Sequence, residues 1–400
     1  MPMLMLNARR IRFPFSNCAW LLLLGCFLGA CTSKPEVVKS APLQSIEDPL
    51  KFKVYWKKDI GSPFEVGSGP VVPLVSADKI LIADGNSRVR ALSVHKGREQ
   101  WSRKFKRQFG GGIGGDETEL LFASLDGTLS LLELHTGEPI WEVQASSEIV
   151  TPVAVSDARV MVQSVDGRVQ AFDRASGEPQ WQYRSNVPLL SLRGNAAPQI
   201  HDDQVIAAFA DGSLVALDLD TGLVNWQHFV AMPSGRTELE RLVDVDGAFA
   251  VSGSLVYAVS YQGKAMAVDL YTGDLVWEKA LSSVAGLIAH GGRVFVVDDQ
   301  SHVWALNARN GEVSWVQTQL QARGLGAPVI VGNYLVVSDD LGYVHWLDPS
   351  EGVLRGRKRL GKGRLTLVSH TWVDPDENST SQPRLIAVSS RAKLVFMGLR

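Results

Sequence analysis

Few residues of this 400-residue chain stand at spacings typical of catalysis or ligand binding. The stretch FGGGIGG (109–115) contains G-x-G-x-x-G at Gly110, Gly112 and Gly115. That pattern cradles a phosphate only when a strand precedes it and a helix follows it. Here the acidic and strand-like run DETELLFASL follows, so we interpret the glycines as part of a flexible inner strand. The later run GKGR (361–364) lacks the spacing of a Walker phosphate loop and is excluded as well.

Histidine and cysteine patterns argue against metal and nucleophile chemistry. The 8 histidines are scattered, and neither HExxH nor a paired-cysteine motif occurs, so we predict no zinc or other metal site. No G-x-S-x-G elbow is present to present a nucleophilic serine. We therefore predict no catalytic residues and no cofactor.

One of the 3 cysteines, Cys31, stands in a pattern that predicts a chemical role. Basic residues precede an apolar run from Ala19 to Ala30, and a polar stretch follows Cys31. A basic region, a short apolar region and small residues before a cut make up a secretory signal. The run of about 12 residues is shorter than the roughly 20 that span a membrane as a helix. We therefore predict that residues 1–30 are a cleaved signal peptide.

The sequence Leu28-Gly29-Ala30-Cys31 resembles the lipobox of bacterial lipoproteins. The resemblance implies a diacylglycerol thioether on Cys31 and acyl chains such as palmitate on the new N-terminus. The other two cysteines fall within the signal, so the mature chain could form no internal disulfide. Thr32 is not the aspartate that commonly retains lipoproteins in the inner membrane, so we expect the periplasmic face of the outer membrane. The alternative is an ordinary secreted protein.

Residues 31–50 are predicted to be the lipidated cysteine and a flexible tether, because prolines and mixed charges follow Cys31 without apolar periodicity. The whole chain has 40 Lys+Arg and 42 Asp+Glu. Removal of the signal takes away three basic residues, which leaves 37 against 42, a net charge of −5. Such a balance offers no electrostatic case for nucleic acid binding.

Residues 51–400 are built from a sequence repeat, and the period of such a repeat indicates the fold. Its copies are ALSVHKGREQW (91–101), LLELHTGEPIW (131–141), AFDRASGEPQW (171–181), ALDLDTGLVNW (216–226), AVDLYTGDLVW (267–277), ALNARNGEVSW (305–315) and WLDPSEGVLRG (346–356), the last without its tryptophan. A period of roughly forty residues is typical of propeller blades or helical arrays. Apolar and polar residues alternate before each copy, which is the period of strands.

Three features of the copy predict its local structure. The glycine marks a tight turn with positive φ. Asp173, Asp218 and Asp269 precede that turn, where a carboxylate accepts hydrogen bonds from turn amides. The tryptophan lies on the outer strand and packs against the neighbouring unit.

The chain ends predict how the ring of units closes. The segment after residue 364 has three strand-like runs and no fourth strand with tryptophan. The missing strand stands at the other end of the chain, in FKVYWKKDI (52–60) with Trp56. We therefore predict an all-β, eight-bladed β-propeller closed by an N-terminal strand, with seven blades as the alternative.

The repeat A-x-D-x-x-T-G-x-x-x-W resembles the PQQ-type propeller repeat, which two eight-bladed families share. One comprises the quinoprotein alcohol dehydrogenases, which typically need adjacent disulfide-bonded cysteines and a calcium site. The other is the BamB family of lipoproteins in the β-barrel assembly (BAM) machinery. The lipobox, LLSLRGNAAP (189–198) and LVDVDGAFAVSG (242–253) all look like the BamB family.

The BamB resemblance implies a non-enzymatic scaffold that binds the periplasmic POTRA domains of BamA and assists insertion of barrel proteins. It assigns Leu190, Leu192 and Arg193 to BamA contact, and Asp244 and Asp246 are candidates for an acidic companion on the same rim. The other interpretation of the two leucines is a place in the core. A quinoprotein dehydrogenase and a generic protein-binding propeller remain alternatives, and direct contact with unfolded outer-membrane proteins stays open.

Overall fold

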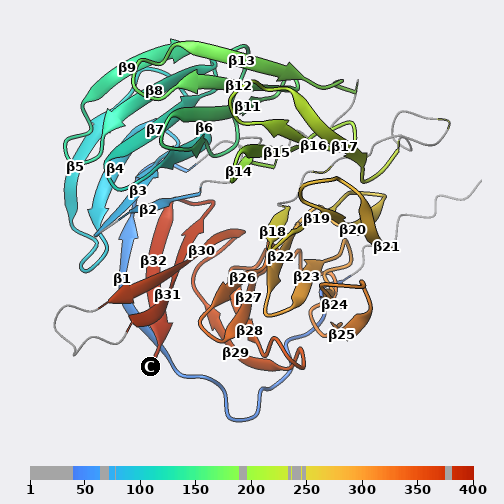
Figure 1. Cartoon of the computed structure of the whole chain (residues 1–400). Helices are drawn as coiled ribbons and strands as arrows, with labels where there is room; N and C mark the ends of the chain where they lie inside the picture. Colours follow the sequence, from blue (N-terminus) through green and yellow to red (C-terminus); the bar gives the residue numbers. More distant parts are fainter. Residues whose placement is uncertain are drawn as a thin grey trace, which may run out of the picture. The chain divides into compact units, whose positions relative to one another are not determined.

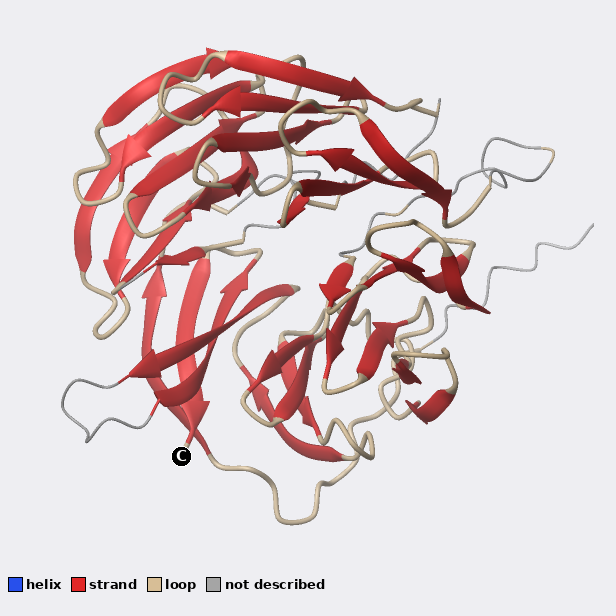
Figure 2. Cartoon of the chain, viewed as in Figure 1, coloured by secondary structure: helices blue, strands red, loops and turns tan. Residues whose placement is uncertain are grey.

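Strands build the body of the chain, and no helix occurs among the residues that the structure describes (Figure 2). The computed structural model describes residues 39–63, 72–76, 78–188, 196–232, 236, 245, 249–373 and 381–400. Residues 40–400 form one compact unit.

Eight four-stranded antiparallel sheets, the blades, follow one another around a ring (Figure 1). The first four are blade 1 with β2 (Leu74–Ser76), β3 (Lys79–Ala83), β4 (Arg88–Ser93) and β5 (Glu99–Lys104), blade 2 with β6 (Phe109–Gly115), β7 (Glu119–Ser124), β8 (Thr128–Glu133) and β9 (Pro139–Gln144), blade 3 with β10 (Ala154–Val155), β11 (Arg159–Ser164), β12 (Arg168–Asp173) and β13 (Pro179–Arg184), and blade 4 with β14 (Gln199–His201), β15 (Gln204–Ala208), β16 (Ser213–Asp218) and β17 (Val224–Phe229). The other four are blade 5 with β18 (Ala250–Ser252), β19 (Leu255–Val259), β20 (Lys264–Asp269) and β21 (Leu275–Ala280), blade 6 with β22 (Leu287–His290), β23 (Arg293–Val297), β24 (Val303–Asn307) and β25 (Val313–Gln317), blade 7 with β26 (Val329–Val331), β27 (Tyr334–Ser338), β28 (Tyr343–Leu347) and β29 (Leu354–Arg359), and blade 8 with β30 (Leu365–Val373), β31 (Ser381–Ser389), β32 (Lys393–Leu399) and β1 (Phe52–Asp59).

Blade 8 joins the two ends of the body. Its strand order is β1-β32-β31-β30, so the N-terminal strand supplies the outer strand of the last blade. Trp56 of β1 pairs with Phe396 of β32, and the indole Nε1 donates to the carbonyl of Val94 in blade 1 at 2.8 Å. The predicted eight-bladed ring and its closure by the N-terminal strand are confirmed, and the seven-bladed alternative is wrong.

The glycine-rich stretch lies in β6, the first strand of blade 2. A Cβ on Gly110 would lie 1.9 Å from the carbonyl oxygen of Ile149, and one on Gly114 would lie 2.2 Å from that of Val153. Any larger residue would collide with the backbone that leads into blade 3. The predicted inner strand of blade 2 is confirmed, and Gly110 and Gly114 allow close backbone packing in it.

The repeat tryptophans join each blade to the next. Trp277 of blade 5 donates from Nε1 to the carbonyl of Ala308 at 2.9 Å, and a Cβ on Gly311 would lie 2.7 Å from its ring. Gly311 has φ +70°, so a glycine here both adopts the left-handed backbone of the turn and leaves space for the Trp277 ring. The same pairing of a tryptophan with the turn glycine of the following blade occurs at Trp56/Gly97, Trp101/Gly137, Trp141/Gly177, Trp181/Gly222, Trp226/Gly273 and Trp315/Gly352. The predicted packing of the tryptophan on the neighbouring unit is confirmed.

The predicted role of the aspartate before the turn is also confirmed. Asp173 Oδ1 accepts from the backbone N–H groups of Ala175 and Ser176 at 3.1 and 2.9 Å. These hydrogen bonds favour the ionised form and hold the pKa of Asp173 below its ordinary value. Asp218 and Asp269 accept turn amides in the same way.

The outer strand of blade 7 has no tryptophan at the repeat position, and another part of the chain fills that space. The equivalent residue is Gly356, and a Cβ there would lie 2.7 Å from the Phe52 ring. Phe52 in turn packs on Trp346 with ring centroids 5.3 Å apart. The N-terminal segment thus supplies the apolar volume that the repeat provides elsewhere.

Residues 40–50 lie against blade 7 and the segment before it. The backbone N–H of Ala41 donates to the carbonyl of Gln321 at 3.0 Å, and that of Leu50 donates to the carbonyl of Arg355 at 2.9 Å. Arg357 donates to the carbonyl of Gln44 between these points at 2.8 Å. The sequence led us to treat all of residues 31–50 as a flexible tether, whereas fixed contacts with the body begin at Ser40.

A buried ionic cluster anchors the start of this segment. Arg323 donates to the Asp339 carboxylate at 2.8 and 2.6 Å and to the carbonyl of Ala41 at 2.8 Å. His345 lies 3.0 Å from the same carboxylate. Burial lowers the pKa of His345 in spite of the neighbouring Asp339, so the imidazole is neutral at pH 7.

Candidate partner-binding surface

Every blade has two ends, and the candidate residues come from segments at one of them. In blade 4, the N–H of Val230 donates to the carbonyl of Gly212 at 2.8 Å, so the outer strand ends beside the turn between β15 and β16. In blade 3, Ser185 donates to Gly167 in the same way at 2.8 Å. The segments that lead from one blade to the next therefore lie beside the turns that join the second and third strands. We call this end of the ring the connection face.

The sequence-predicted site residues lie outside the described residues: Cys31, Leu190, Leu192, Arg193, Asp244 and Asp246. The structure does describe the residues on either side of the two loops. Ala196, Val245 and Phe249 are buried and belong to one hydrophobic cluster that blades 4 and 5 share. Both segments with candidate contact residues are thus anchored in the same piece of core.

A direct hydrogen bond ties the two segments together. Gln199, the first residue of β14, donates from Nε2 to the carbonyl of Phe249 at 2.9 Å. Gln199 follows the segment with Leu190, Leu192 and Arg193, and Phe249 follows the segment with the two aspartates. The two loops therefore rejoin the body side by side on the connection face.

Hydrogen bonds and an aromatic contact fix the residues that precede the first loop. Ser185 Oγ donates to Asp211 at 2.8 Å, and Asp211 also accepts from the backbone N–H of Ser213 at 3.0 Å. Tyr183 packs on Phe209 with ring centroids 5.6 Å apart. Burial, with the Asp211 charge, raises the pKa of Tyr183 and keeps the phenol neutral.

Large apolar side chains are exposed in the described residues of blades 3 to 5 before the two loops. Val187 is 45% exposed, Phe229 40% and Met232 70%. They stand on the blade 3 to 4 connection, at the end of β17 and on the blade 4 to 5 connection, respectively. Large exposed apolar side chains at the connections between blades are candidates for contact with a partner protein. Sequence reasoning missed these three residues, although Val187 stands only three positions before Leu190.

Other chemistry finds little support in the described part of the chain. No group of three or more His, Cys, Asp or Glu is arranged there to hold a metal ion. The histidine with the most altered environment, His345, is buried in the ionic cluster of blade 7. No helix among the described residues has the length and apolar character needed to cross a membrane.

Comparison with known proteins points to one family. The family model described as "Outer membrane protein assembly factor BamB" matches residues 85–317 and 289–397. The chain is 41% identical over 366 residues to the outer membrane protein assembly factor BamB of Pseudomonas aeruginosa, with 90% of this chain and 95% of that protein covered. It is 33% identical over 341 residues to the Escherichia coli K12 protein of the same name, with 83% and 86% covered.

Solved structures agree on the fold. The crystal structure of BamB from Moraxella catarrhalis matches with a TM-score of 0.75 at 28% identity, with 87% of this chain and 99% of that chain covered. The quinohemoprotein alcohol dehydrogenase of Comamonas testosteroni matches with a TM-score of 0.68 at 12% identity, with 87% of this chain and 76% of that chain covered. The second likeness shows the fold alone.

Proposed function

The chain belongs to the BamB family of outer membrane protein assembly factors, and on this basis we propose that it is a lipid-anchored, non-enzymatic scaffold that binds BamA. The anchor would be the acylated Cys31 on the periplasmic face of the outer membrane. The partner surface would be the POTRA domains of BamA. The observation that carries this proposal is the hydrogen bond between Gln199 and Phe249, which joins the residues that follow the two loops on the connection face.

Leu190 and Leu192 would be the apolar anchors of the interface, and Arg193 would fork to a carboxylate or to backbone carbonyls of the partner. Asp244 and Asp246 would add acidic contacts from the neighbouring loop. Val245 between them is buried, so the two aspartates flank a fixed point of the backbone. The exposed side chains of Val187, Phe229 and Met232 would add apolar contact area to that of the two leucines.

The test is a binding measurement with purified BamA POTRA domains and the variant Arg193→Glu. Interface arginines in such positions contribute about 2 kcal/mol or more, so binding should weaken at least about thirtyfold. Arg184→Glu is the matched control, because Arg184 is an exposed arginine at the end of β13 in the same connection. The melting temperatures of both variants should stay within a few degrees of the parent.

Three results would contradict the assignment. Normal binding by Arg193→Glu would show that the arginine is not part of the interface. An equal loss in Arg184→Glu would show that general charge, rather than this loop, controls binding. A loss that comes with unfolding of Arg193→Glu would make the residue structural.

The non-enzymatic part of the proposal has its own test. A quinone absorption band in the purified protein, together with dye-linked alcohol oxidation, would replace the scaffold with the quinoprotein alternative. We expect a spectrum of aromatic side chains only and no oxidation.

A further inference from the structure

The turns at the two ends of the ring differ in the charged residues that they carry. The face opposite the connection face carries the turns that join first to second and third to fourth strands. Acidic residues crowd these turns: Asp78, Asp116, Glu117, Glu133, Glu138, Asp157, Asp173, Glu178, Asp202, Asp203, Asp218, Asp220, Asp269, Asp274, Glu312, Asp348 and Glu351. A chain with a formal net charge of only −2 must therefore hold compensating basic residues elsewhere.

Exposed basic residues gather on the connection face of three consecutive blades, 7, 8 and 1. We call this set the basic surface: Lys104, Lys106, Arg107, Lys358, Arg359, Lys362, Arg364, Arg391 and Lys393. The positions follow from the strand pairing, since Lys104 pairs with Arg88 after the β3–β4 turn and Arg359 pairs with Tyr343 after the β27–β28 turn. A backbone hydrogen bond of 3.1 Å from Ser390 to Arg364 joins the loops of blades 7 and 8.

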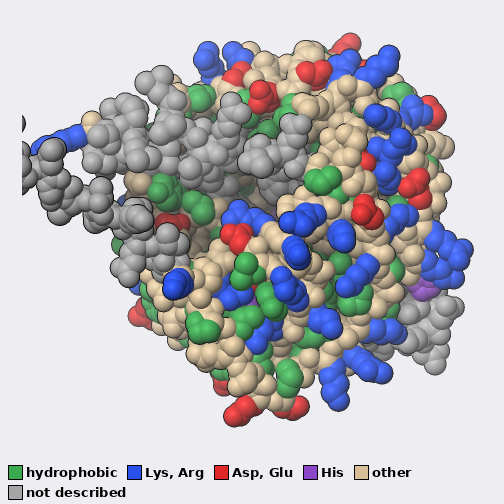
Figure 3. All heavy atoms as spheres, turned by 180° about the vertical axis from the view of Figure 1, so that it is seen from behind, with side chains coloured by type: hydrophobic (Ala, Val, Ile, Leu, Met, Phe, Trp, Pro, Cys, Tyr) green, Lys and Arg blue, Asp and Glu red, His purple; other side chains and the backbone are tan. Residues whose placement is uncertain are grey.

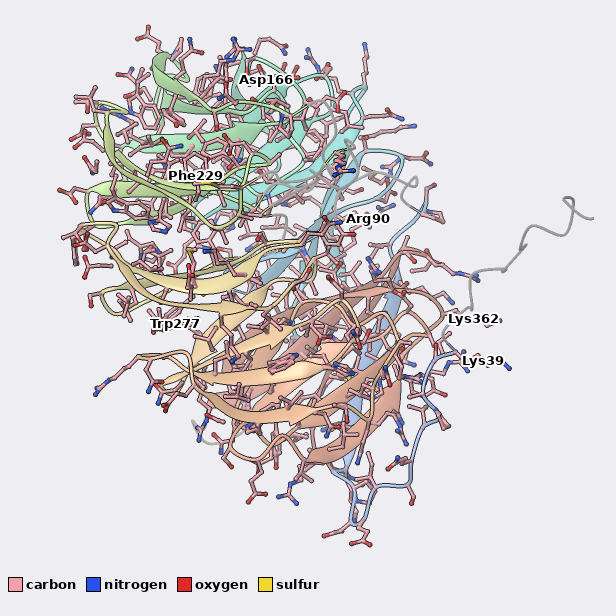
Figure 4. The ribbon with its side chains drawn as sticks, turned by 90° about the vertical axis from the view of Figure 1, so that its right-hand side faces the viewer. Lys39, Arg90, Asp166, Phe229, Trp277 and Lys362 are labelled. Carbon is pink, nitrogen blue, oxygen red and sulfur yellow. The ribbon has the colours of Figure 1, made fainter. Side chains whose placement is uncertain are left out.

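Most of these charges are not neutralised within the described part of the chain. Arg364 pairs with Asp340 at 2.8 Å, and Arg107 lies 3.4 Å from Asp126. Six of the other residues make no ion pair with a described residue: Lys104, Lys106, Lys358, Lys362, Arg391 and Lys393. Seen from behind, Lys and Arg side chains gather over the lower and right-hand part of the molecule with few acids among them (Figure 3). Figure 4 labels Lys362 at its right-hand edge, which is the side of the molecule that faces the viewer in Figure 3.

One part of the basic surface is hollowed. An open hollow of about 520 Å³ is lined by Lys104, Lys106 and Arg107, together with Gly85–Ser87 of the β3–β4 turn. Asn86 adds an amide to this lining. Ammonium, guanidinium and amide donors around an open hollow suit a phosphate group that carries further substituents.

The N-terminal segment leaves the body on the same face. Ser40 and Ala41 are held at residues 321–323, in the connection between β25 and β26 of blades 6 and 7. Eight residues, 32–39, separate Cys31 from Ser40. A chain of that length spans at most about 28 Å when fully extended.

We propose that the basic surface of blades 7, 8 and 1 binds the anionic phospholipid surface to which the chain is anchored. The proposal rests on the proposed lipidation of Cys31 for its biological setting. A lipid and a basic patch are the two signals that together give stable membrane attachment. The limited reach of the eight residues between Cys31 and Ser40 favours phospholipid over an acidic protein as the occupant. The acidic residues on the turns of the opposite face would be repelled by the same membrane, which favours an orientation with the basic surface toward it.

The experiment measures sedimentation of the unlipidated mature chain from Thr32 to Arg400 with vesicles. The vesicles are phosphatidylcholine with or without phosphatidylglycerol. We expect binding only to the anionic vesicles at about 0.1 M salt, with loss at high salt because exposed charges are screened. Each basic residue near such a surface strengthens binding severalfold. The triple variant K362E/R391E/K393E should therefore bind about 100-fold more weakly.

A matched control changes the same amount of charge on the opposite face. The variant K96E/R98E/R309E alters exposed basic residues of the β4–β5 and β24–β25 turns. It should keep vesicle binding within about threefold of the parent. The melting temperatures of both triple variants should match, since all six side chains are exposed.

Three outcomes would overturn the proposal. The first is equal binding to neutral and anionic vesicles, and the second is an equal loss in both triple variants. The third is intact vesicle binding by K362E/R391E/K393E with loss of a protein from the purified assembly, which would assign the surface to an acidic protein. The assay contains neither BamA nor a lipidated cysteine, so its failure would leave the BamA and anchor proposals standing. Failure of the BamA proposal would leave the vesicle result standing, whereas failure of the anchor proposal would remove its biological setting.

Discussion

Replacing Gly311 with alanine tests whether the tryptophan contact holds neighbouring blades together. Gly311 has φ +70°, and a Cβ there would lie 2.7 Å from the Trp277 ring. The left-handed backbone alone costs an alanine about 1–2 kcal/mol. Overpacking against a buried ring adds about 1–3 kcal/mol. Gly311→Ala should thus lower the free energy of unfolding by about 2–5 kcal/mol.

Gly291 separates these two contributions. Its φ is +57°, but a Cβ there would meet nothing within 4 Å. Gly291→Ala should therefore cost only the backbone strain of about 1–2 kcal/mol. The measurement is urea unfolding followed by far-ultraviolet circular dichroism, which does not depend on tryptophan emission.

A double variant tests directly whether the Trp277 ring causes the extra cost of Gly311→Ala. In a Trp277→Ala background the ring is gone, so Gly311→Ala should cost no more than Gly291→Ala. The tryptophan contact would be refuted if Gly311→Ala and Gly291→Ala destabilised the parent equally. It would also be refuted if the cost of Gly311→Ala were unchanged without the Trp277 ring.

Three further predictions concern the anchor, the closure and one buried histidine. Cys31→Ser should leave a larger, uncleaved precursor in the inner membrane, and normal cleavage seen by immunoblotting would disprove the lipid anchor. Deletion of residues 50–60 removes β1, so the exposed edge of β32 should lower the melting temperature and cause self-association on size-exclusion chromatography. The pKa of His345 is lowered by burial, so stability should be complete above about pH 6.5 and fall as the pH drops below it. Melting curves of His345→Gln between about pH 7 and pH 5 should fall less steeply than those of the parent, and parallel curves would count against a buried neutral imidazole.

The repeat determined most of the fold because its information is local and recurs. A turn glycine with positive φ, a carboxylate that accepts turn amides and a tryptophan on the outer strand could each be assigned from their neighbours in the chain. The closure by Trp56 could be predicted as well, since an incomplete blade at one end requires a strand from the other. The family resemblance supplied the candidate contacts in the two loops, and no local pattern would have done so.

What the tertiary structure decided depends on contacts between distant parts of the chain. Gly356 stands where a tryptophan was expected, and only the folded chain shows Phe52 in its place. Arg323 reads as an ordinary loop arginine until folding buries it between Asp339 and Ala41. The position of the N-terminal segment could not be read from its composition, because its partners lie about three hundred residues away.

The same distinction applies to charge. Composition alone determined that the chain is nearly neutral, with 40 basic and 42 acidic residues. Lys104, Lys362 and Lys393 are far apart in sequence, and each reads alone as a solvated residue beside a turn. Ring closure places blades 7, 8 and 1 next to one another with all their connections on one face. Basic residues of three neighbouring blades thereby meet on the connection face, because the fold repeats the same strand order in every blade and so places each kind of turn at its own end of the ring.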